Sequence, residues 1–392
     1  MPHYPYLIIG GGMTAAAAVH GIREVDPTGA IGVVGREHHR PYQRPPLSKA
    51  LWKGKPLDRV WIELAQQGVD RLLGRKVQAL DVAHKRVIDD QGSEYTFDKL
   101  LLATGGTPRR LAWGGDDIIY YRTLDDYQRL RTLAEQGQRF AVIGGGFIGS
   151  EIAAALAMNG KQVVLLFPGA GLGEHAFGPE LSGFLNEYYK QHGVEVLPGE
   201  IAVGLERSNG QIALQTRGGE KLLVDGVVAG IGIEPNTELA RTAGLNVENG
   251  IIVDALLRTS NPDIYAAGDV ANFANPALGK RLRVEHEDNA NTMGKYAGRN
   301  MAGAQESYDH LPFFYSDLFD LGYEAVGELD ARLDIVADWK APFREGVLYY
   351  LREGRVRGVL LWNVWEQVDA ARRLIAEPGP FQPSDLRGRL PA

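Results

Sequence analysis

Cysteine is absent from the 392 residues of the sequence. This absence excludes disulfide bonds, thiolate zinc and iron–sulfur sites, a cysteine nucleophile and catalysis through a redox-active dithiol. Long apolar runs are also lacking, since none approaches the roughly 18–20 residues that a membrane-spanning helix needs. No signal peptide is evident, because residues 1–5 lead directly into an apolar strand pattern. We therefore expect a cytoplasmic protein with no membrane span and no metal site.

An excess of positive charge is lacking as well. The 42 Lys and Arg residues stand against 49 Asp and Glu residues, which gives a net charge of −7. Because nucleic-acid binding depends on a concentrated positive surface, we expect no nucleic-acid partner. Glycine is abundant instead, with 49 residues, which indicates many tight turns or close approaches of the backbone to ligands. A chain of this length is expected to form two or three domains.

The first glycine-rich motif lies at residues 6–20 and reads YLIIGGGMTAAAAVH. An apolar strand, a glycine turn and an alanine-rich helix follow one another, which is the context that a dinucleotide-binding fingerprint requires. Gly10 permits the tight turn, Gly12 lets the backbone approach a pyrophosphate, and Ala15 keeps the helix close to the sheet. The next predicted strand ends near Glu37, where an acid is placed to bind a ribose hydroxyl.

A second and fuller motif lies at residues 140–153 and reads FAVIGGGFIGSEIA. Its glycines are Gly144, Gly146 and Gly149, and a further strand is predicted at 162–167. One such motif is a weak signal, because glycines that merely turn a strand into a helix look similar. Two copies in the same context indicate two separate dinucleotide sites.

Two further strand ends carry small or acidic residues. An apolar strand from residue 97 ends at Ala103, Thr104 and Gly105, and a later one ends at Asp269. Ligands of open α/β sheets bind outside the carboxyl ends of the strands, which makes Asp269 a candidate to accept hydrogen bonds from a sugar-like chain. An Asp that caps a turn or helix would give the same pattern.

These four signals, in this order, resemble the two-dinucleotide-binding flavoprotein superfamily, which includes glutathione reductase and the ferredoxin reductases. Residues 44–49 (RPPLSK) and 103–109 (ATGGTPR) resemble segments of oxygenase-coupled ferredoxin reductases and of apoptosis-inducing factor. Three later segments favour apoptosis-inducing factor and its bacterial relatives: 283–290 (RVEHEDNA), 314–318 (FYSDL) followed by 322–325 (GYEA), and 358–363 (GVLLWN). The resemblance implies an α/β protein with two Rossmann-like domains, which bind FAD and NAD(P)H, and a C-terminal α+β domain.

The resemblance also implies domain boundaries. The FAD-binding domain is expected at 1–117 and 246–310, the NAD(P)H-binding domain at 118–245, and the C-terminal domain at 311–392. Within the last of these, alternating patterns at 345–351 and 355–361 predict strands, and a helical pattern follows over 364–375. The tail over 378–392 is expected to be loosely ordered.

Site residues follow from the resemblance position by position. Those implied on the FAD side are Gly10, Gly12, Ala15, Glu37, Arg44, Lys49, Ala103, Thr104, Gly105, Arg109, Asp269, Glu285, His286 and Tyr315. Those implied on the NAD side are Gly144, Gly146, Phe147, Gly149, Glu151, Gly232 and Glu324.

Four of these residues are implied to act at the reacting rings. Lys49, held by Glu151, is expected beside flavin N5, and Glu151 is expected in the first turn of a helix, where the dipole favours an acid. A helix predicted over 289–301 would direct its positive end at the flavin pyrimidine, with His286 against the ring. Phe147 is expected at the nicotinamide–flavin stack, although core packing is the commoner role of Phe.

The nicotinamide preference is less clear from the sequence. After the strand at 162–167 an acid would select NAD and an Arg would select NADP, but Gly169 stands there. Glu174 in the next loop is the candidate substitute. Because no basic residue is present to bind a 2′-phosphate, NADH is predicted rather than NADPH.

The predicted reaction is hydride transfer from NAD(P)H to flavin N5, followed by electron transfer to an unidentified acceptor. A quinone, a small oxidant and a small electron-transfer protein all fit the acceptor. Two alternatives stay open: a ferredoxin or rubredoxin reductase of an oxygenase system, and a redox sensor in which NADH changes dimerisation or partner binding. A homodimer is therefore also left open.

Overall fold

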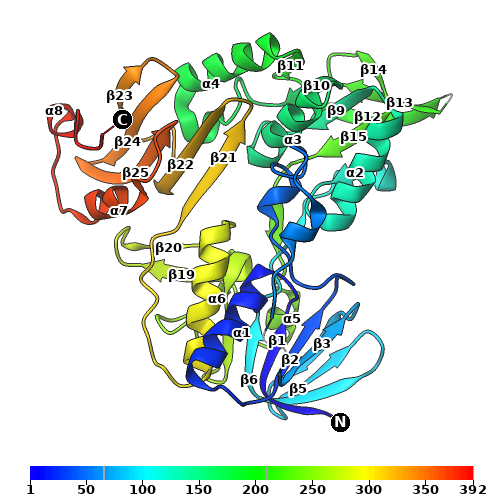
Figure 1. The fold of residues 1–392 in the computed structure, drawn as a ribbon, viewed down its shortest axis with the longest axis vertical. Helices are drawn as coiled ribbons and strands as arrows, with labels where there is room; N and C mark the ends of the chain where they lie inside the picture. The colour runs from blue at the N-terminus through cyan, green and yellow to red at the C-terminus, as the bar shows by residue number, and fades with distance from the viewer. Residues whose placement is uncertain (65–66, 209, 392) are drawn as a thin grey trace. The chain divides into compact units, whose positions relative to one another are not determined.

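The computed structural model describes residues 1–64, 67–208 and 210–391, and the chain divides into two compact units (Figure 1). Unit 1 consists of 1–43, 58–107 and 234–312, and unit 2 consists of 44–57, 108–233 and 313–392. Two short strands, β7 (Gly106–Pro108) and β16 (Ile233–Pro235), pair where the chain leaves unit 1 and where it returns. The division into three domains that the sequence suggested stays a prediction.

A largely parallel sheet forms the centre of unit 1. Its order is β3-β2-β1-β6, and β18 also pairs with β6; the strands are β1 (His3–Ile9), β2 (Ile31–Gly35), β3 (Val69–Leu73), β6 (Glu94–Leu102) and β18 (Ile264–Ala266). Side chains such as Leu7, Ile8 and Leu101 are fully buried, as expected for parallel strands that are covered on both faces. The remaining strands extend this sheet or form a small second one: β4 (Val77–Asp81), β5 (Arg86–Asp89), β17 (Ile251–Ile252), β19 (Ala271–Asn275) and β20 (Lys280–Leu282).

Helices α1 (Met13–Val25) and α6 (Glu287–Met301) lie side by side in unit 1 (Figure 1). Their backbones approach closely, because small residues line the contact: a Cβ on Gly298 would lie 2.1 Å from the carbonyl oxygen of Ala18. The helix predicted at 289–301 is thereby confirmed, with two more residues at its start. The short helical segments of this unit are η2 (Leu57–Val60), which begins at the boundary with unit 2, η4 (Gly268–Val270) and α5 (Glu238–Thr242).

Unit 2 contains a second parallel sheet with the order β11-β10-β9-β15-β8. Its strands are β8 (Ile118–Tyr120), β9 (Arg139–Ile143), β10 (Gln162–Phe167), β11 (Val194–Pro198) and β15 (Gly226–Ala229), and its helices are α2 (Leu124–Gln136), α3 (Phe147–Met158) and α4 (Glu174–Gln191). A three-stranded antiparallel sheet follows, with β12 (Ala202–Ser208), β13 (Gln211–Thr216) and β14 (Lys221–Val224). The 3-10 helices are η1 (Pro45–Leu47) and η3 (Gly115–Asp117). The β11-β10-β9-β15 order repeats the β3-β2-β1-β6 order, so the predicted pair of Rossmann-like folds is confirmed.

The C-terminal part of unit 2 is an antiparallel sheet with the order β21-β22-β25-β24-β23 and a helix, α7. The bounds are β21 (Phe313–Leu318), β22 (Leu321–Gly327), β23 (Asp334–Ala341), β24 (Glu345–Arg352), β25 (Arg355–Trp362) and α7 (Val368–Ala376). Both predicted strands are confirmed. The helix begins at Val368 rather than at 364, because Asn363 and Glu366 adopt positive φ angles of 52° and 64° and turn the chain first.

The tail after residue 378 is packed, and the prediction that it is loosely ordered is wrong. It contains α8 (Pro383–Leu386), and the side chains of Leu386 and Leu390 are buried. The Leu390 N–H donates to the Tyr349 hydroxyl over 3.2 Å, and the Gly388 N–H donates to Asp338 over 2.7 Å. In the part of the chain that the structure describes, no helix combines the length and the apolar character needed to cross a membrane.

Candidate functional site

The first glycine loop joins β1 to α1 in unit 1. Gly10 has φ of +129°, and a Cβ there would lie 2.1 Å from the carbonyl oxygen of Ala103, so the position admits only glycine. Gly12 is the N-cap residue of α1 and supplies no capping side chain, while Ala15 is fully buried against the sheet. The positive end of α1 therefore begins directly at a turn of bare backbone, which fits a pyrophosphate.

Two other strand ends lie around this loop. After β6, the turn is held by Asn236: its side chain donates to the Thr104 carbonyl oxygen over 2.8 Å, and its backbone N–H donates to that of Gly105 over 2.9 Å. After β18, a Cβ on Gly268 would lie 2.3 Å from the Thr14 hydroxyl of α1. The half-buried Asp269 follows directly. Unit 1 thus brings the predicted residues of β1, β6 and β18 to one end of the sheet.

Glu37 follows β2 and is half-buried, whereas the neighbouring Arg36 is exposed. The hydroxyl of Tyr42 donates a hydrogen bond of 2.5 Å to Glu37 Oε2, and the Tyr42 side chain is itself buried. The carboxylate is therefore fixed beside the strand end where a ribose hydroxyl was predicted to bind. Sequence reasoning missed Tyr42, because nothing in the residue order links it to Glu37.

His286 is the N-cap residue of α6, and Glu285 precedes it. Although part of the His286 side chain is exposed, crowding by the protein lowers its pKa to about 4, against the opposing charges of Asp269 and Asp288. Its imidazole is therefore neutral at pH 7. Glu285 is exposed and forms an ion pair of 2.8 Å with Arg283.

The second glycine loop joins β9 to α3 in unit 2. A Cβ on Gly144 would lie 2.4 Å from the carbonyl oxygen of Gly230, and one on Gly149 would lie 1.8 Å from that of Gly144, so packing requires glycine at both. Gly146 differs: its φ is −86°, and a Cβ there would meet no atom within 4 Å. Protein packing does not require glycine at this position, and the open space fits the close approach of a nucleotide.

Helix α3 and strand β21 contact each other through one face of each element. Phe147 and Glu151 are four residues apart and share one face of the helix, while Phe314 and Ser316 are two residues apart and share one face of the strand. The ring centroids of Phe147 and Phe314 are 4.9 Å apart, and the Ser316 hydroxyl donates to Glu151 over 2.6 Å. Phe147 nevertheless keeps 38% of its surface exposed, which is unusual for a large apolar side chain.

Glu151 carries a buried carboxylate with three partners. Its side chain is 3% exposed; Lys49 Nζ lies 2.7 Å away, and the Ser48 hydroxyl donates over 2.5 Å. The expectation that Glu151 lies in the first turn of its helix is wrong, because it is the fifth residue of α3. Its charge is balanced by Lys49 and two serine hydroxyls. These serines were missed, although each adjoins a predicted residue, Lys49 or Tyr315.

Tyr315 and Glu324 are directly opposite each other on β21 and β22. Lys49 Nζ lies 5.3 Å from the centroid of the Tyr315 ring, within the range of a cation–π contact. Burial, with a smaller effect of the Glu366 charge, raises the pKa of Glu324. Its Oε2 atom is buried and has no hydrogen-bond partner among the residues that the structure describes. A polar ligand is one way to satisfy such an atom.

The other predicted residues of unit 2 lie in loops. The Arg109 side chain is exposed, and its backbone N–H donates to the Gly232 carbonyl oxygen over 2.9 Å, so these two residues are adjacent. Gly232 has φ of +87°, which favours glycine. Arg44 is half-buried and donates to the Arg122 carbonyl oxygen over 3.0 Å.

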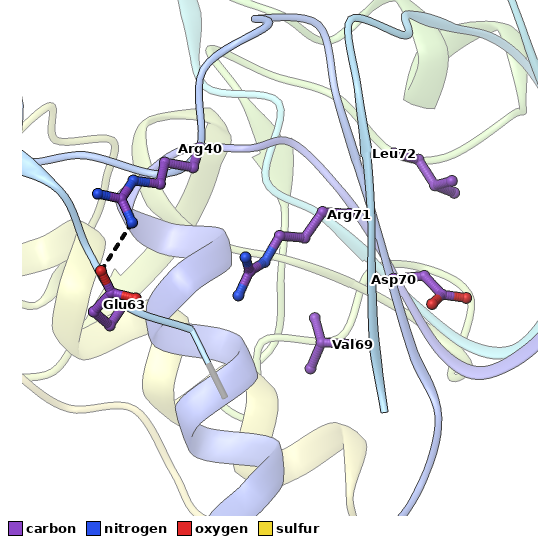
Figure 2. Close-up of a pocket in the computed structure, with 6 residues that line it drawn as sticks. All are labelled: Arg40, Glu63, Val69, Asp70, Arg71 and Leu72. Atoms are coloured by element: carbon purple, nitrogen blue, oxygen red, sulfur yellow. Dashed lines mark hydrogen bonds and ion pairs between the residues drawn. The ribbon is translucent and has the colours of Figure 1, made fainter. Parts of the chain in front are cut away.

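A pocket of about 620 Å³ lies elsewhere in unit 1, and Figure 2 shows the residues that line it: Arg40, Glu63, Val69, Asp70, Arg71 and Leu72. Val69 and Arg71 point to one side of β3, and Asp70 and Leu72 point to the other (Figure 2). Arg40 and Glu63 form an ion pair of 2.9 Å. None of the lining residues was predicted from the sequence as a site residue.

Most of the chain matches known protein families. Residues 4–294 match the pyridine nucleotide-disulphide oxidoreductase family, and residues 297–342 and 337–377 match the C-terminal domain of mitochondrion-associated apoptosis-inducing factor. A 5,5′-dehydrodivanillate O-demethylase ferredoxin reductase subunit of Sphingobium sp. is 36% identical, over 96% of this chain and 94% of the relative. Apoptosis-inducing factor 1 of Dictyostelium discoideum is 32% identical, over 95% and 78%. Putidaredoxin reductase, solved in covalent complex with putidaredoxin, superposes with a TM-score of 0.91 at 30% identity, covering 98% of this chain and 95% of that one.

Proposed function

The chain belongs to the pyridine nucleotide-disulphide oxidoreductase family and is an FAD-dependent NAD(P)H oxidoreductase, and we propose that it passes electrons to a small electron-transfer protein of the ferredoxin type. The family resemblance seen in the sequence is thereby confirmed. Because the chain contains no cysteine, it does not work through a dithiol of its own, despite the family name. The proposed acceptor rests on one observation. The chain superposes over 98% of its length, with a TM-score of 0.91, on a reductase that was solved with its redox partner.

The residues present fit the two nucleotides. We propose that Gly10, Gly12 and the start of α1 hold the FAD pyrophosphate, and that Glu37 and Asp269 bind its ribose and ribityl hydroxyls. Gly144 and Gly146 would hold the pyrophosphate of the nicotinamide nucleotide in the same way. When bound, FAD supplies the ability to take a hydride and release single electrons.

Lys49 and Glu151 are proposed to control charge at the reacting ring. A buried carboxylate is stable only with a cation and hydrogen-bond donors, and Lys49, Ser48 and Ser316 supply these to Glu151. In return, the ion pair of 2.7 Å with Glu151 keeps the Lys49 ammonium in one position. A fixed ammonium group stabilises negative charge that develops near it, which is the condition of a reduced flavin.

Three further residues are proposed to position the rings. The exposed Phe147 offers an apolar surface to a nicotinamide, and the unpaired Oε2 of Glu324 offers an acceptor to a carboxamide. His286 is neutral at pH 7, so it adds no positive charge of its own and offers a ring for stacking or hydrogen bonding. Tyr315 is proposed to lie near the nicotinamide.

Reconstitution with a ferredoxin tests the acceptor. The holoprotein would be mixed with NADH, cytochrome c and putidaredoxin, and the reduction of cytochrome c would be followed by absorbance. We expect fast reduction that requires both NADH and putidaredoxin, together with rapid bleaching of the flavin by NADH alone without oxygen. A rate that does not change when putidaredoxin is omitted would contradict a ferredoxin-type acceptor and favour a quinone or small oxidant.

The match of the C-terminal part to apoptosis-inducing factor favours a second candidate, an NADH-responsive sensor. In that case NADH would reduce the flavin slowly and leave a stable charge-transfer absorbance at long wavelength, and the protein would form a homodimer. Stopped-flow reduction and size-exclusion chromatography with and without NADH separate the two candidates. Fast reduction and an unchanged elution volume would exclude the sensor.

We also propose that the protein acts in the cytoplasm, because the reduced nicotinamide nucleotide that it consumes is produced there. Cell fractionation followed by immunoblotting tests this location. Recovery in a membrane or periplasmic fraction would contradict it.

A further inference from the structure

We infer that Glu174 selects NADH over NADPH, by binding the hydroxyls of the adenosine ribose and repelling a 2′-phosphate. The inference rests on the proposed use of NADH and assigns the choice of nucleotide to one side chain. It concerns the loop of residues 168–173, which joins β10 to α4 in unit 2.

In a Rossmann fold the adenosine ribose of the nucleotide binds at the end of the second strand, which is β10 in unit 2. An acid at the end of the second strand accepts hydrogen bonds from the 2′-hydroxyl of NAD, and a base there binds the 2′-phosphate of NADP. In this chain β10 ends at Phe167, and the residues that follow are Pro168, Gly169 and Ala170. None of these residues carries a charge, so a charged residue that binds the ribose must come from another position.

Glu174, the first residue of α4, brings a carboxylate back to this strand end. Its Oε2 accepts a hydrogen bond of 2.7 Å from the Ala170 N–H. A Cβ built on Gly169 would lie 2.0 Å from Glu174 Oε1 and 2.4 Å from Cδ. The carboxylate therefore occupies the space where a side chain at 169 would begin, and Gly169 is the residue that leaves room for it.

The loop that carries this arrangement is fixed on three sides. The Gly173 N–H donates to the carbonyl oxygen of Gly145, within the second glycine loop, over 2.9 Å. The Gly199 N–H, after β11, donates to the Gly169 carbonyl oxygen over 2.8 Å. The Asn186 side chain donates to the Ala170 carbonyl oxygen over 2.9 Å and accepts from the Leu172 N–H over 3.1 Å. Glu174 is thus held in a set position relative to the loop proposed to bind the pyrophosphate.

The charge around Glu174 also favours NADH. Its side chain is 31% exposed, so the carboxylate is open to a ligand. Residues 168–174 include no Lys or Arg. Among the residues that the structure describes, the one base within 4.0 Å of the Glu174 carboxylate is His175, whose Nε2 lies 3.9 Å from Glu174 Oε1 and whose side chain is 98% exposed. A 2′-phosphate placed here would meet a carboxylate with no fixed cation to offset the repulsion.

A purely structural role for Glu174, as a clip on the loop, makes a different prediction. Glu174→Gln keeps an oxygen that accepts the hydrogen bond from the Ala170 N–H but removes the charge. This substitution therefore distinguishes a role in holding the loop from a role in selecting the nucleotide. The double substitution Gly169→Asp with Glu174→Ala moves the acid to the strand end itself. No positive φ is recorded for Gly169, so an Asp is compatible with its backbone. Glu180→Gln changes an exposed acid of α4 beyond the kink at Gly178 and is the matched control.

The test measures dissociation constants of NAD⁺ and NADP⁺ for the oxidised holoprotein by calorimetry, and kcat/KM for NADH and NADPH with ferricyanide. We expect Glu174→Gln to lower the NAD⁺ over NADP⁺ affinity ratio about tenfold or more, because a hydrogen-bonded charge is lost. Glu174→Ala should do the same, and adding Gly169→Asp should restore the ratio.

An affinity ratio that stays within about twofold of wild type in Glu174→Gln would overturn the inference. An equal change in Glu180→Gln would overturn it too, because the effect would then be one of net charge. Either result leaves the proposed function intact as long as NADH still bleaches the flavin. Failure of wild-type protein to bind or be reduced by either nucleotide would instead overturn the proposed function, and this inference with it.

Discussion

The two glycine loops have the same sheet order behind them but differ in what surrounds them. In unit 1 the helix after the loop, α1, packs against α6 through small residues, and its side chains are largely buried. In unit 2 the helix after the loop, α3, presents Phe147 and Ile148 with 38% and 39% of their surface exposed. The helix after the first loop is thus covered by its own unit, whereas the helix after the second loop begins with exposed apolar side chains. This difference suits a nucleotide that stays bound in the first case and one that exchanges in the second.

The acid near each loop differs as well. In unit 1, Glu37 comes two residues after β2 and is fixed by the buried hydroxyl of Tyr42. In unit 2, the strand end has no acid, and Glu174 reaches it from α4 with a backbone N–H as its anchor. Both units thus have the glycine turn between strand and helix, while the acid near the second strand comes from a different position of the chain in each.

The largest effect is expected where the first loop is tightest. Gly10→Ala forces a side chain against the Ala103 backbone at a φ of +129°, so we expect a loss of more than about 3 kcal/mol in unfolding free energy and loss of bound FAD. Chemical denaturation and the flavin absorbance measure the two effects. Gly54→Ala is the control: it has a φ of +80° but open space around it, and should cost about 1 kcal/mol. Equal costs for both substitutions would show that the close approach to β6 does not matter.

The next effect separates holding the flavin from reducing it. Lys49→Ala removes the ammonium beside Glu151, and we expect flavin reduction by NADH to slow on the order of 10²-fold while the flavin stays bound. Anaerobic stopped-flow absorbance gives the rate, and the spectrum gives the flavin content. Lys53→Ala removes a lysine of the same segment that pairs with Asp317 at the surface, and should reduce at the wild-type rate. Wild-type kinetics in the Lys49 variant would remove this residue from the reaction.

A smaller effect is expected at the second loop. Gly146→Ala adds a methyl group where no protein atom lies within 4 Å, so the melting temperature should stay at the wild-type value. The same methyl group would meet a pyrophosphate, and we expect KM for NADH to rise about tenfold. Differential scanning fluorimetry and steady-state kinetics give the two quantities. A lower melting temperature with unchanged KM would mean that this glycine serves the fold, as Gly10 does.

The smallest effect concerns pH. His286 has an ordinary pKa of 6.5 when unfolded and about 4 when folded, so only the unfolded chain takes up its proton between these values. Its contribution to stability is therefore present above pH 6.5 and is lost as the pH falls toward 4. We expect His286→Gln to reduce this acid-dependent loss by on the order of 1 kcal/mol, measured by denaturation across the range. A wild-type pH profile in the His286 variant would contradict the lowered pKa.

Much of the fold could be read from the residue order, because glycine turns between strand and helix patterns are local signals. The strand β10 begins and ends where its apolar run does, and α6 differs from its predicted range by two residues. The tail was misjudged because its few apolar residues, Leu386 and Leu390, have no periodicity to mark them. Strands β21 and β23 were not predicted, since they are the partly exposed edges of the last sheet and carry a weak alternation. Strand β22, which lies between β21 and β25 and is largely buried, was not predicted either.

Less of the candidate site than of the fold could be predicted from the sequence. The contact of Lys49 with Glu151 followed from a resemblance and not from spacing, since about a hundred residues separate the two. The hydroxyls of Ser48, Ser316 and Tyr42 were missed, because a serine or tyrosine that binds a carboxylate looks like any other until the fold brings the two together. The roles proposed for these residues toward the nucleotides stay predictions.

The Glu151 carboxylate has partners from two distant stretches of chain, and this has a consequence for biosynthesis. Residues 48 and 49 are synthesised before the acid, and Ser316 is added only 165 residues after it. Until then the acid must remain hydrated, because enclosing it with part of its shell missing would cost more than leaving it in water. Nascent chains that stop short of β21 should therefore be incompetent for electron transfer, whatever nucleotide they have already captured.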